Sequence, residues 1–167
     1  MTARETKRCK VGELRPSQIL TTFGIGSIID LPNLSVMAMG LEDWPVKDTV
    51  EIGEERLLAS VRALLGQQVQ ALRSAPVVPD TYDVSQFGPS SLVGVPVAPF
   101  PRWMVCPHCR RLAPISSGLF KLETPYRTEQ IRYVHANCSK PGKPPTVVPA
   151  RFIVACRNGH LDDFPWR

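Results

Sequence analysis

The chain has no long apolar run and no apolar segment behind its polar, basic first ten residues. The sequence therefore predicts neither a signal peptide nor a membrane span. Cysteine is also scarce, with 5 in 167 residues. An odd number of cysteines without a secretion signal is typical of a reducing compartment. Together these absences predict a cytoplasmic protein that makes no membrane contact.

The motifs of common enzyme classes are missing as well. There is no Ser-His-Asp arrangement, no HExxH and no glycine-rich nucleotide loop ending in Gly-Lys-Ser/Thr. His160, Asp162 and Asp163 could still hold a catalytic metal or perform acid–base chemistry. Adjacent carboxylates in a strand point to opposite faces, however, which weakens this interpretation. We predict that the chain is not an enzyme, with a metal-dependent hydrolase or nuclease as the alternative.

The few cysteines and histidines are concentrated in one region. Four of the five cysteines and all three histidines lie between residues 102 and 166. A Cys-x-x-Cys at Cys106 and Cys109 is followed by a His-x-x-Cys at His135 and Cys138. Two donors at this spacing can bind one metal ion from a tight turn, and two such turns supply the four donors of tetrahedral Zn²⁺. The sequence predicts the two knuckles of a zinc ribbon.

Other interpretations of these residues remain open. A Cys-x-x-Cys can be a disulfide or a redox motif, but a redox motif is expected in a βαβ context, which the sequence does not indicate. The fourth zinc ligand is the least defined, because Cys156 or His160 could replace His135.

Composition predicts an α+β chain in four parts. Of its 17 prolines, 14 fall between Pro76 and Pro165, so the second half should hold short strands and loops, not long helices. The expected parts are a flexible basic arm, a small helical or mixed α+β part, a linker or long loop, and a short-stranded zinc-ribbon-like module. Their expected boundaries are residues 1–10, 11–75, 76–94 and 95–167.

Local patterns predict the elements of each part. In the first half they are a short helix starting near Ser17, two strands, an amphipathic helix from Glu54 and a short second helix over 68–73. The strands are expected at residues 28–31 and 35–39, and the amphipathic helix should pack on a core. In the second half, strands are expected at 95–103, 119–122, 130–134 and 147–155. The apolar, β-branched stretch 151–155 is expected to run through the centre of a sheet.

Charge is distributed unevenly along the chain. Residues 99–167 carry 11 Lys/Arg against 4 Asp/Glu, whereas residues 1–98 carry 9 against 11. A basic surface with arginines beside aromatic residues favours phosphate backbones and exposed bases. Four arginines are the candidate contacts to DNA, without sequence preference: Arg102, Arg110, Arg111 and Arg151.

Several of these motifs resemble, in order, those of the DrmB family, a subunit of the DISARM anti-phage defence system. In the first half they are Val11 to Gln18, Thr21 to Gly24 and Asp30 to Pro32. In the second half they are Phe100 to Trp103, Cys106 to Cys109, Tyr133 to Cys138 and Ala155 to Trp166.

The resemblance implies a subunit that works with DrmA, a helicase-like ATPase, to bind and restrict phage DNA. The ATPase motifs would lie in DrmA, in agreement with their absence here. Family members continue for several hundred residues, so the resemblance also implies an N-terminal fragment, and an inactive fragment is a further alternative. The near-neutral residues 1–98 are expected to contact the protein partner, and the basic half to contact DNA.

Overall fold

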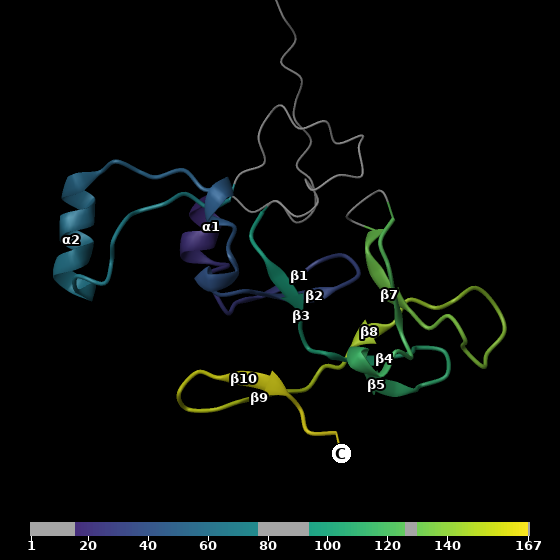
Figure 1. Ribbon diagram of the computed structural model, residues 1–167. Coiled ribbons are helices and arrows are strands. Elements are labelled where there is room, and N and C mark those ends of the chain that lie inside the picture. The colour runs from purple at the N-terminus through teal and green to yellow at the C-terminus, as the bar shows by residue number, and fades with distance from the viewer. Residues whose placement is uncertain (1–15, 77–93, 126–129, 167) are drawn as a thin grey trace, which may run out of the picture. The chain divides into compact units, whose positions relative to one another are not determined.

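The computed structural model describes residues 16–76, 94–125 and 130–166 (Figure 1). The predicted basic arm and nearly all of the predicted linker lie outside these ranges. Helices in the described ranges are α1 (Pro16–Thr21) and α2 (Glu55–Leu65), with short 3₁₀ turns η1 (Leu41–Asp43), η2 (Val46–Asp48) and η4 (Ile115–Ser117). None of these helices has the length and apolar content required to cross a membrane.

The strands are all short and pair antiparallel. They are β1 (Ile28–Asp30), β2 (Ser35–Ala38), β3 (Val97–Pro99), β4 (Trp103–Val105), β5 (Leu112–Pro114), β6 (Lys121–Glu123), β7 (Arg132–Val134), β8 (Val148–Pro149), β9 (Ile153–Ala155) and β10 (Leu161–Asp163). Few helices and several small antiparallel sheets confirm the expected α+β class, with a zinc-ribbon-like module in the C-terminal part.

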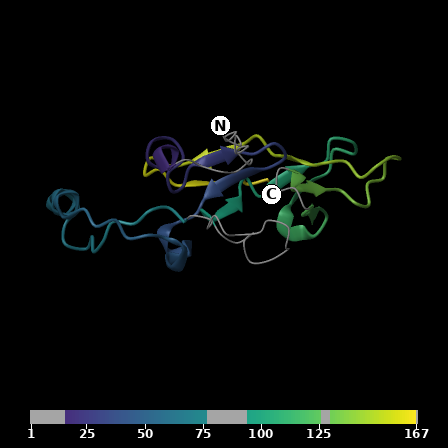
Figure 2. The ribbon, with the colours of Figure 1, turned by 90° about the horizontal axis from the view of Figure 1, so that it is seen from above.

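The described residues divide into two compact units, one formed by residues 16–38 with 97–125 and 130–166, and the other by residues 39–76 with 94–96. The first unit joins segments from both ends of the sequence through the sheet β1-β2-β3 (Figures 1 and 2). In this sheet Val36 lies opposite Ile29 and Pro99. A small core of Ile29, Val36 and Ala38 forms here, with Phe23 packed against it. The sequence boundaries of the predicted parts remain a prediction.

The zinc-ribbon-like module consists of the sheet β5-β4-β8 and the hairpin β6-β7. Strand β4 is central, and its Met104 lies opposite Ala113 of β5 and Pro149 of β8. A bridge between Val134 and Thr146 extends the β6-β7 pairing. The core of this module consists of Met104, Cys106, Phe120 and Val147. Cys106 is both a member of this core and a predicted metal ligand, so the predicted metal site lies directly beside the core.

The hairpin β9-β10 is the last element of the chain (Figure 1). Within the part of the chain that the structure describes, its strands pair only with each other, with Val154 opposite Asp162. The three residues of β9 are exposed, so the expectation that residues 151–155 form a central strand is wrong. Arg151 and Phe152 lie in no described strand, because the chain leaves the β4 sheet at Ala150, whose N–H donates to the Trp103 carbonyl oxygen (2.8 Å).

Helix α2 forms where its leucine pattern predicts it, but none of its residues is buried. Leu64 is 85% exposed and Leu65 is 60% exposed. The expectation that α2 packs on a core is therefore wrong for the described residues. The expected second helix over 68–73 is absent too, since Arg73 instead forms an isolated antiparallel bridge with Glu51.

Candidate metal centre

The first knuckle follows strand β4 directly. The Cys106 N–H donates to the Arg111 carbonyl oxygen, and the Arg110 N–H donates to the Cys106 carbonyl oxygen, both at 2.9 Å. Arg110 takes a positive φ of 62°, which reverses the chain between β4 and β5. This turn is compact enough to hold the Cys106 and Cys109 side chains on the same side.

The second knuckle follows strand β7. The N–H of His135 donates to the Pro145 carbonyl oxygen (3.1 Å), and the N–H of Val147 donates to the Tyr133 carbonyl oxygen (2.9 Å). These bonds fix the start of the knuckle to the segment that leads into β8. His135 is fully buried, and the ring of Phe120 packs against its imidazole at 90° with ring centroids 5.5 Å apart.

The two knuckles bring four donor side chains together: Cys106, Cys109, His135 and Cys138. Their donor atoms all lie within 4.8 Å of one another. Cys106 and His135 are fully buried, while Cys109 and Cys138 are partly buried. Four convergent donors that are largely shielded from water leave little room for a substrate or a labile water. This arrangement can bind a metal ion.

The spacing of the donors suits a tetrahedral ion of the size of Zn²⁺. With Zn–S near 2.3 Å and Zn–N near 2.0–2.1 Å, two sulfurs would lie about 3.8 Å apart, and a sulfur and a nitrogen about 3.5 Å apart. The Sγ atoms of Cys106 and Cys138 are 3.8 Å apart, and Cys109 Sγ lies 3.4 Å from His135 Nδ1. The distances identify Nδ1 as the nitrogen that faces the site. The proton of a neutral imidazole would then be on Nε2, which is buried and has no partner among the described residues.

The protein environment acts differently on the two cysteines of the first knuckle. Burial raises the pKa of the Cys106 thiol, an effect that backbone N–H donors in the turn partly offset. A hydrogen bond from the Arg111 backbone N–H lowers the pKa of the Cys109 thiol. Cys109 is thus the readier of the two to enter the thiolate form, and a bound cation would favour that form at both positions.

Cys156 and His160 do not belong to this cluster. They lie at the tip of the β9-β10 hairpin, where Cys156 Sγ is 3.3 Å from His160 Nδ1. Both side chains are exposed. Among the described residues, the fourth donor next to the three cysteines is therefore His135, and the ligand roles themselves remain a prediction.

The four candidate DNA-contacting arginines lie in different surroundings. Arg110 and Arg111 are exposed on the first knuckle, and Arg151 is exposed after β8. Arg102 instead forms ion pairs with Asp162 (2.7 Å) and Asp163 (2.6 Å). Its hydrogen bond with Asp163 is the main reason that the pKa of Arg102 is raised. Arg102 therefore has less capacity for a phosphate than the other three.

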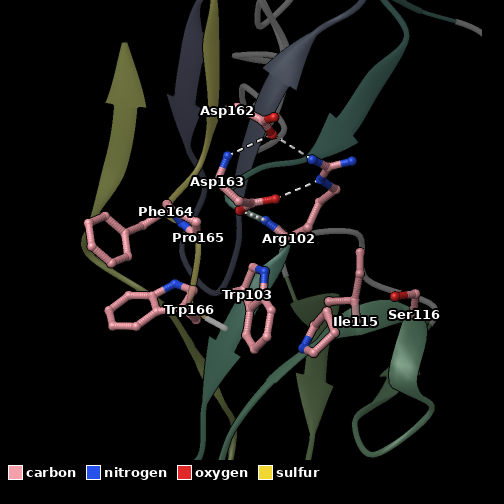
Figure 3. A pocket seen from close by; sticks show the side chains of 10 residues that line it. Arg102, Trp103, Ile115, Ser116, Asp162, Asp163, Phe164, Pro165 and Trp166 are labelled. Atoms are coloured by element: carbon pink, nitrogen blue, oxygen red, sulfur yellow. Dashed lines mark hydrogen bonds and ion pairs between the residues drawn. The ribbon is translucent and has the colours of Figure 1, made fainter.

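The Arg102 carboxylate contacts, which sequence reasoning missed, form a clasp between β10 and the start of β4 (Figure 3). The Arg102 backbone N–H also donates to Asp163 (2.7 Å), and only 8% of the Asp163 side chain is exposed. The clasp borders an open pocket of about 520 Å³ that Trp103, Ile115 and Trp166 also line. This contact could not be predicted from the sequence, because Arg102 and the acidic pair are far apart in the chain and no motif spacing links them. Asp162 and Asp163 are thus engaged by Arg102, and His160 is paired with Cys156.

Comparison with known proteins gives one partial match to a curated protein. The chain is 36% identical over 73 residues to the DISARM protein DrmB of Bacillus paralicheniformis. The match covers 44% of this chain and 12% of that relative, so the chain matches only a small part of the relative's length. It indicates a relation between the two proteins, in agreement with the resemblance in the sequence motifs.

A family profile covers most of the chain. Residues 15–167 match the family described as "Domain of unknown function (DUF8724)". These residues include both knuckles, the β9-β10 hairpin and helix α2. The chain belongs to this family of unknown function.

Proposed function

We propose that the chain is a zinc-stabilised, non-catalytic module of a DISARM-type anti-phage defence complex. The observation that carries the proposal is the convergence of Cys106, Cys109, His135 and Cys138 within 4.8 Å in a buried position. Four protein donors occupy every position of a tetrahedral ion, which is the arrangement of structural zinc and leaves no site for an activated water. The similarity to a DrmB protein supplies the biological setting.

Zinc is the ion that these donors favour. Thiolates and imidazole suit Zn²⁺ better than Mg²⁺ or Ca²⁺, which prefer oxygen ligands. The ion would add to the limited apolar burial of this module, whose core cluster consists of four buried side chains among the described residues. When bound, zinc would supply structural cross-linking between the two knuckles, and no catalytic step is assigned to it.

The alternative of a metal-dependent hydrolase receives less support. A catalytic metal would require His160, Asp162 and Asp163 to converge with an open coordination position. Both carboxylates instead contact Arg102, and His160 Nδ1 lies beside Cys156 Sγ. Within the described residues, the Cys106 cluster is the one place where three or more potential ligands meet.

We further propose that the module docks on a helicase-like ATPase of the DrmA type through its first 98 residues. Leu57, Leu64 and Leu65 leave an apolar strip of helix α2 exposed, between 51% and 85% for each side chain. An apolar strip of this kind is a common feature of protein-binding helices. Residues 1–98 carry 9 Lys/Arg against 11 Asp/Glu and are thus near neutral in charge. This balance favours a protein partner over DNA for the first part of the chain.

Co-purification with a helicase-like ATPase of the DrmA type tests the proposal. We expect the double variant Leu64→Glu with Leu65→Glu to lose at least about tenfold in affinity, because charges placed in a buried interface core are costly. The control variant Leu122→Glu, at a residue 48% exposed in the zinc-ribbon-like module, should bind as the unmodified chain does. Equal binding by all three chains would exclude α2 as the docking surface. Failure of the unmodified chain to bind would contradict the proposed complex.

A further inference from the structure

The tip of the β9-β10 hairpin carries a cysteine and a histidine that do not belong to the Cys106 cluster. Cys156 comes directly after β9, and His160 directly precedes β10. Cys156 Sγ lies 3.3 Å from His160 Nδ1. The corresponding pair in the buried cluster, Cys109 Sγ and His135 Nδ1, is 3.4 Å apart. The exposed pair therefore has nearly the separation of the buried one.

The backbone of the hairpin tip holds this pair in place. The Cys156 N–H donates to the His160 carbonyl oxygen (3.0 Å), and the Gly159 N–H donates to the Cys156 carbonyl oxygen (3.1 Å). Gly159 has a φ of +82°, a conformation that favours glycine. In the first knuckle, Arg110 plays a similar part, with a φ of 62° and an N–H that donates to Cys106. Each turn thus contains a residue with positive φ whose N–H donates to the carbonyl oxygen of the first cysteine of the turn.

We propose that Cys156 and His160 form a second, open site for a divalent cation of the zinc type. A thiolate and an imidazole are donors that Zn²⁺ and Co²⁺ accept readily and that Mg²⁺ and Ca²⁺ do not favour. A tetrahedral ion would place these two donor atoms about 3.5 Å apart, close to the separation in the hairpin. No third Cys, His, Asp or Glu joins the pair among the described residues. Two coordination positions are thus open to water or to donors of another molecule.

The open site should bind metal more weakly than the buried cluster, because it has two protein donors where the cluster has four. It should also exchange metal freely, since both side chains are exposed. The proposal does not depend on the defence function or on the identity of the ion in the buried cluster.

Titration of the full chain with Co²⁺, after loading with one equivalent of Zn²⁺, tests the second site. Cobalt binds such donors less tightly than zinc, so it should leave a zinc-filled cluster intact. We expect a further equivalent of cobalt, with the near-ultraviolet absorption of a sulfur–cobalt bond. Cys156→Ser should abolish this absorption. His160→Ala should weaken cobalt binding by about tenfold or more, because removing even a residue that only hydrogen-bonds to a metal ligand costs that much affinity.

The matched control is His108→Ala, which removes an exposed histidine that lies outside the pair. It should leave the second equivalent unchanged, and retention of one zinc by the Cys156, His160 and His108 variants confirms that these chains are folded. A thiol–imidazole hydrogen bond also fits 3.3 Å, and in that case cobalt would give no sulfur–cobalt absorption, which would overturn the proposal. Absorption that persists in Cys156→Ser but disappears in Cys106→Ser would overturn it as well, since it would place cobalt in the buried cluster.

Discussion

At the scale of single residues, the imidazole of His135 has the most demanding position in the cluster. It is fully buried, packs against Phe120 and directs Nδ1 toward the cysteines. Burying a polar ring is costly unless its nitrogens have partners, and a metal ion would bind Nδ1 where it faces the cysteines. The residue is therefore more sensitive to substitution than an exposed histidine of the same chain.

We expect His135→Ala to lose zinc and to unfold the second half, because three donors remain and a buried cavity forms. His135→Cys should retain zinc, because four thiolates form an equally common tetrahedral site. Zinc content and circular dichroism measure both effects. His160→Ala, the matched exposed control, should leave the tightly bound zinc in place. Similar zinc loss in His160→Ala and His135→Ala would contradict the assignment of the fourth ligand.

The core beside the cluster should also respond to truncation. Met104 is 1% exposed at the centre of the β4 sheet, whereas Met37 of β2 is only half-buried. Met104→Ala should lower the free energy of unfolding by about 2–5 kcal/mol, through lost burial and a cavity. Urea unfolding of the zinc-loaded chain measures this loss. Met37→Ala should cost less, and an equal or larger cost would contradict the placement of the core.

At the scale of the elements, the clasp attaches the β9-β10 hairpin to the rest of its unit. Asp163 of β10 accepts hydrogen bonds from both the backbone and the side chain of Arg102. Asp162 accepts one from the same guanidinium, and its side chain is 67% exposed against 8% for Asp163. Exposed ion pairs contribute little, so Asp163 should carry most of the effect.

We expect Asp163→Ala to release the hairpin, with faster amide exchange over residues 152–166 and a loss of stability of about 1–3 kcal/mol. Hydrogen exchange followed by mass spectrometry measures the local effect. Asp162→Ala, the adjacent control, should change exchange much less. Unchanged exchange in Asp163→Ala would show that other contacts hold the hairpin.

The sequence predicted the elements better than their partners. Spacing alone selected the four side chains that the structure brings together, since metal ligands lie at short, fixed intervals, and their ligand roles stay a prediction. The leucine period located helix α2 within a residue or two. Contacts between residues that are far apart in the sequence have no such local pattern. The contact of β3 with β2 and the clasp between Arg102 and Asp163 join residues about sixty positions apart. The continuous apolar run 151–155 suggested a central strand because apolar content does not distinguish a buried strand from an exposed one.

At the scale of the whole molecule, the positive charge of residues 99–167 predicts salt-sensitive binding to DNA. Phosphate contacts release counterions, so affinity should fall steeply as salt rises. We expect Arg110→Ala with Arg111→Ala to reduce the slope of log affinity against log salt by about 2, one for each lost contact. Arg102 already pairs with two carboxylates in the unmodified chain. Arg102→Ala should therefore change the slope less. Fluorescence anisotropy with a labelled duplex measures the slopes, and binding that is independent of salt would contradict this prediction.

A single zinc ion is expected to join the two knuckles through three cysteine sulfurs and one histidine nitrogen. X-ray absorption spectroscopy at the zinc edge, on the full chain with one bound zinc, measures this coordination shell. We expect three sulfur scatterers at about 2.3 Å and one nitrogen at about 2.0–2.1 Å. A well-folded chain without zinc, or a zinc shell of oxygen ligands with fewer than three sulfurs, would contradict it.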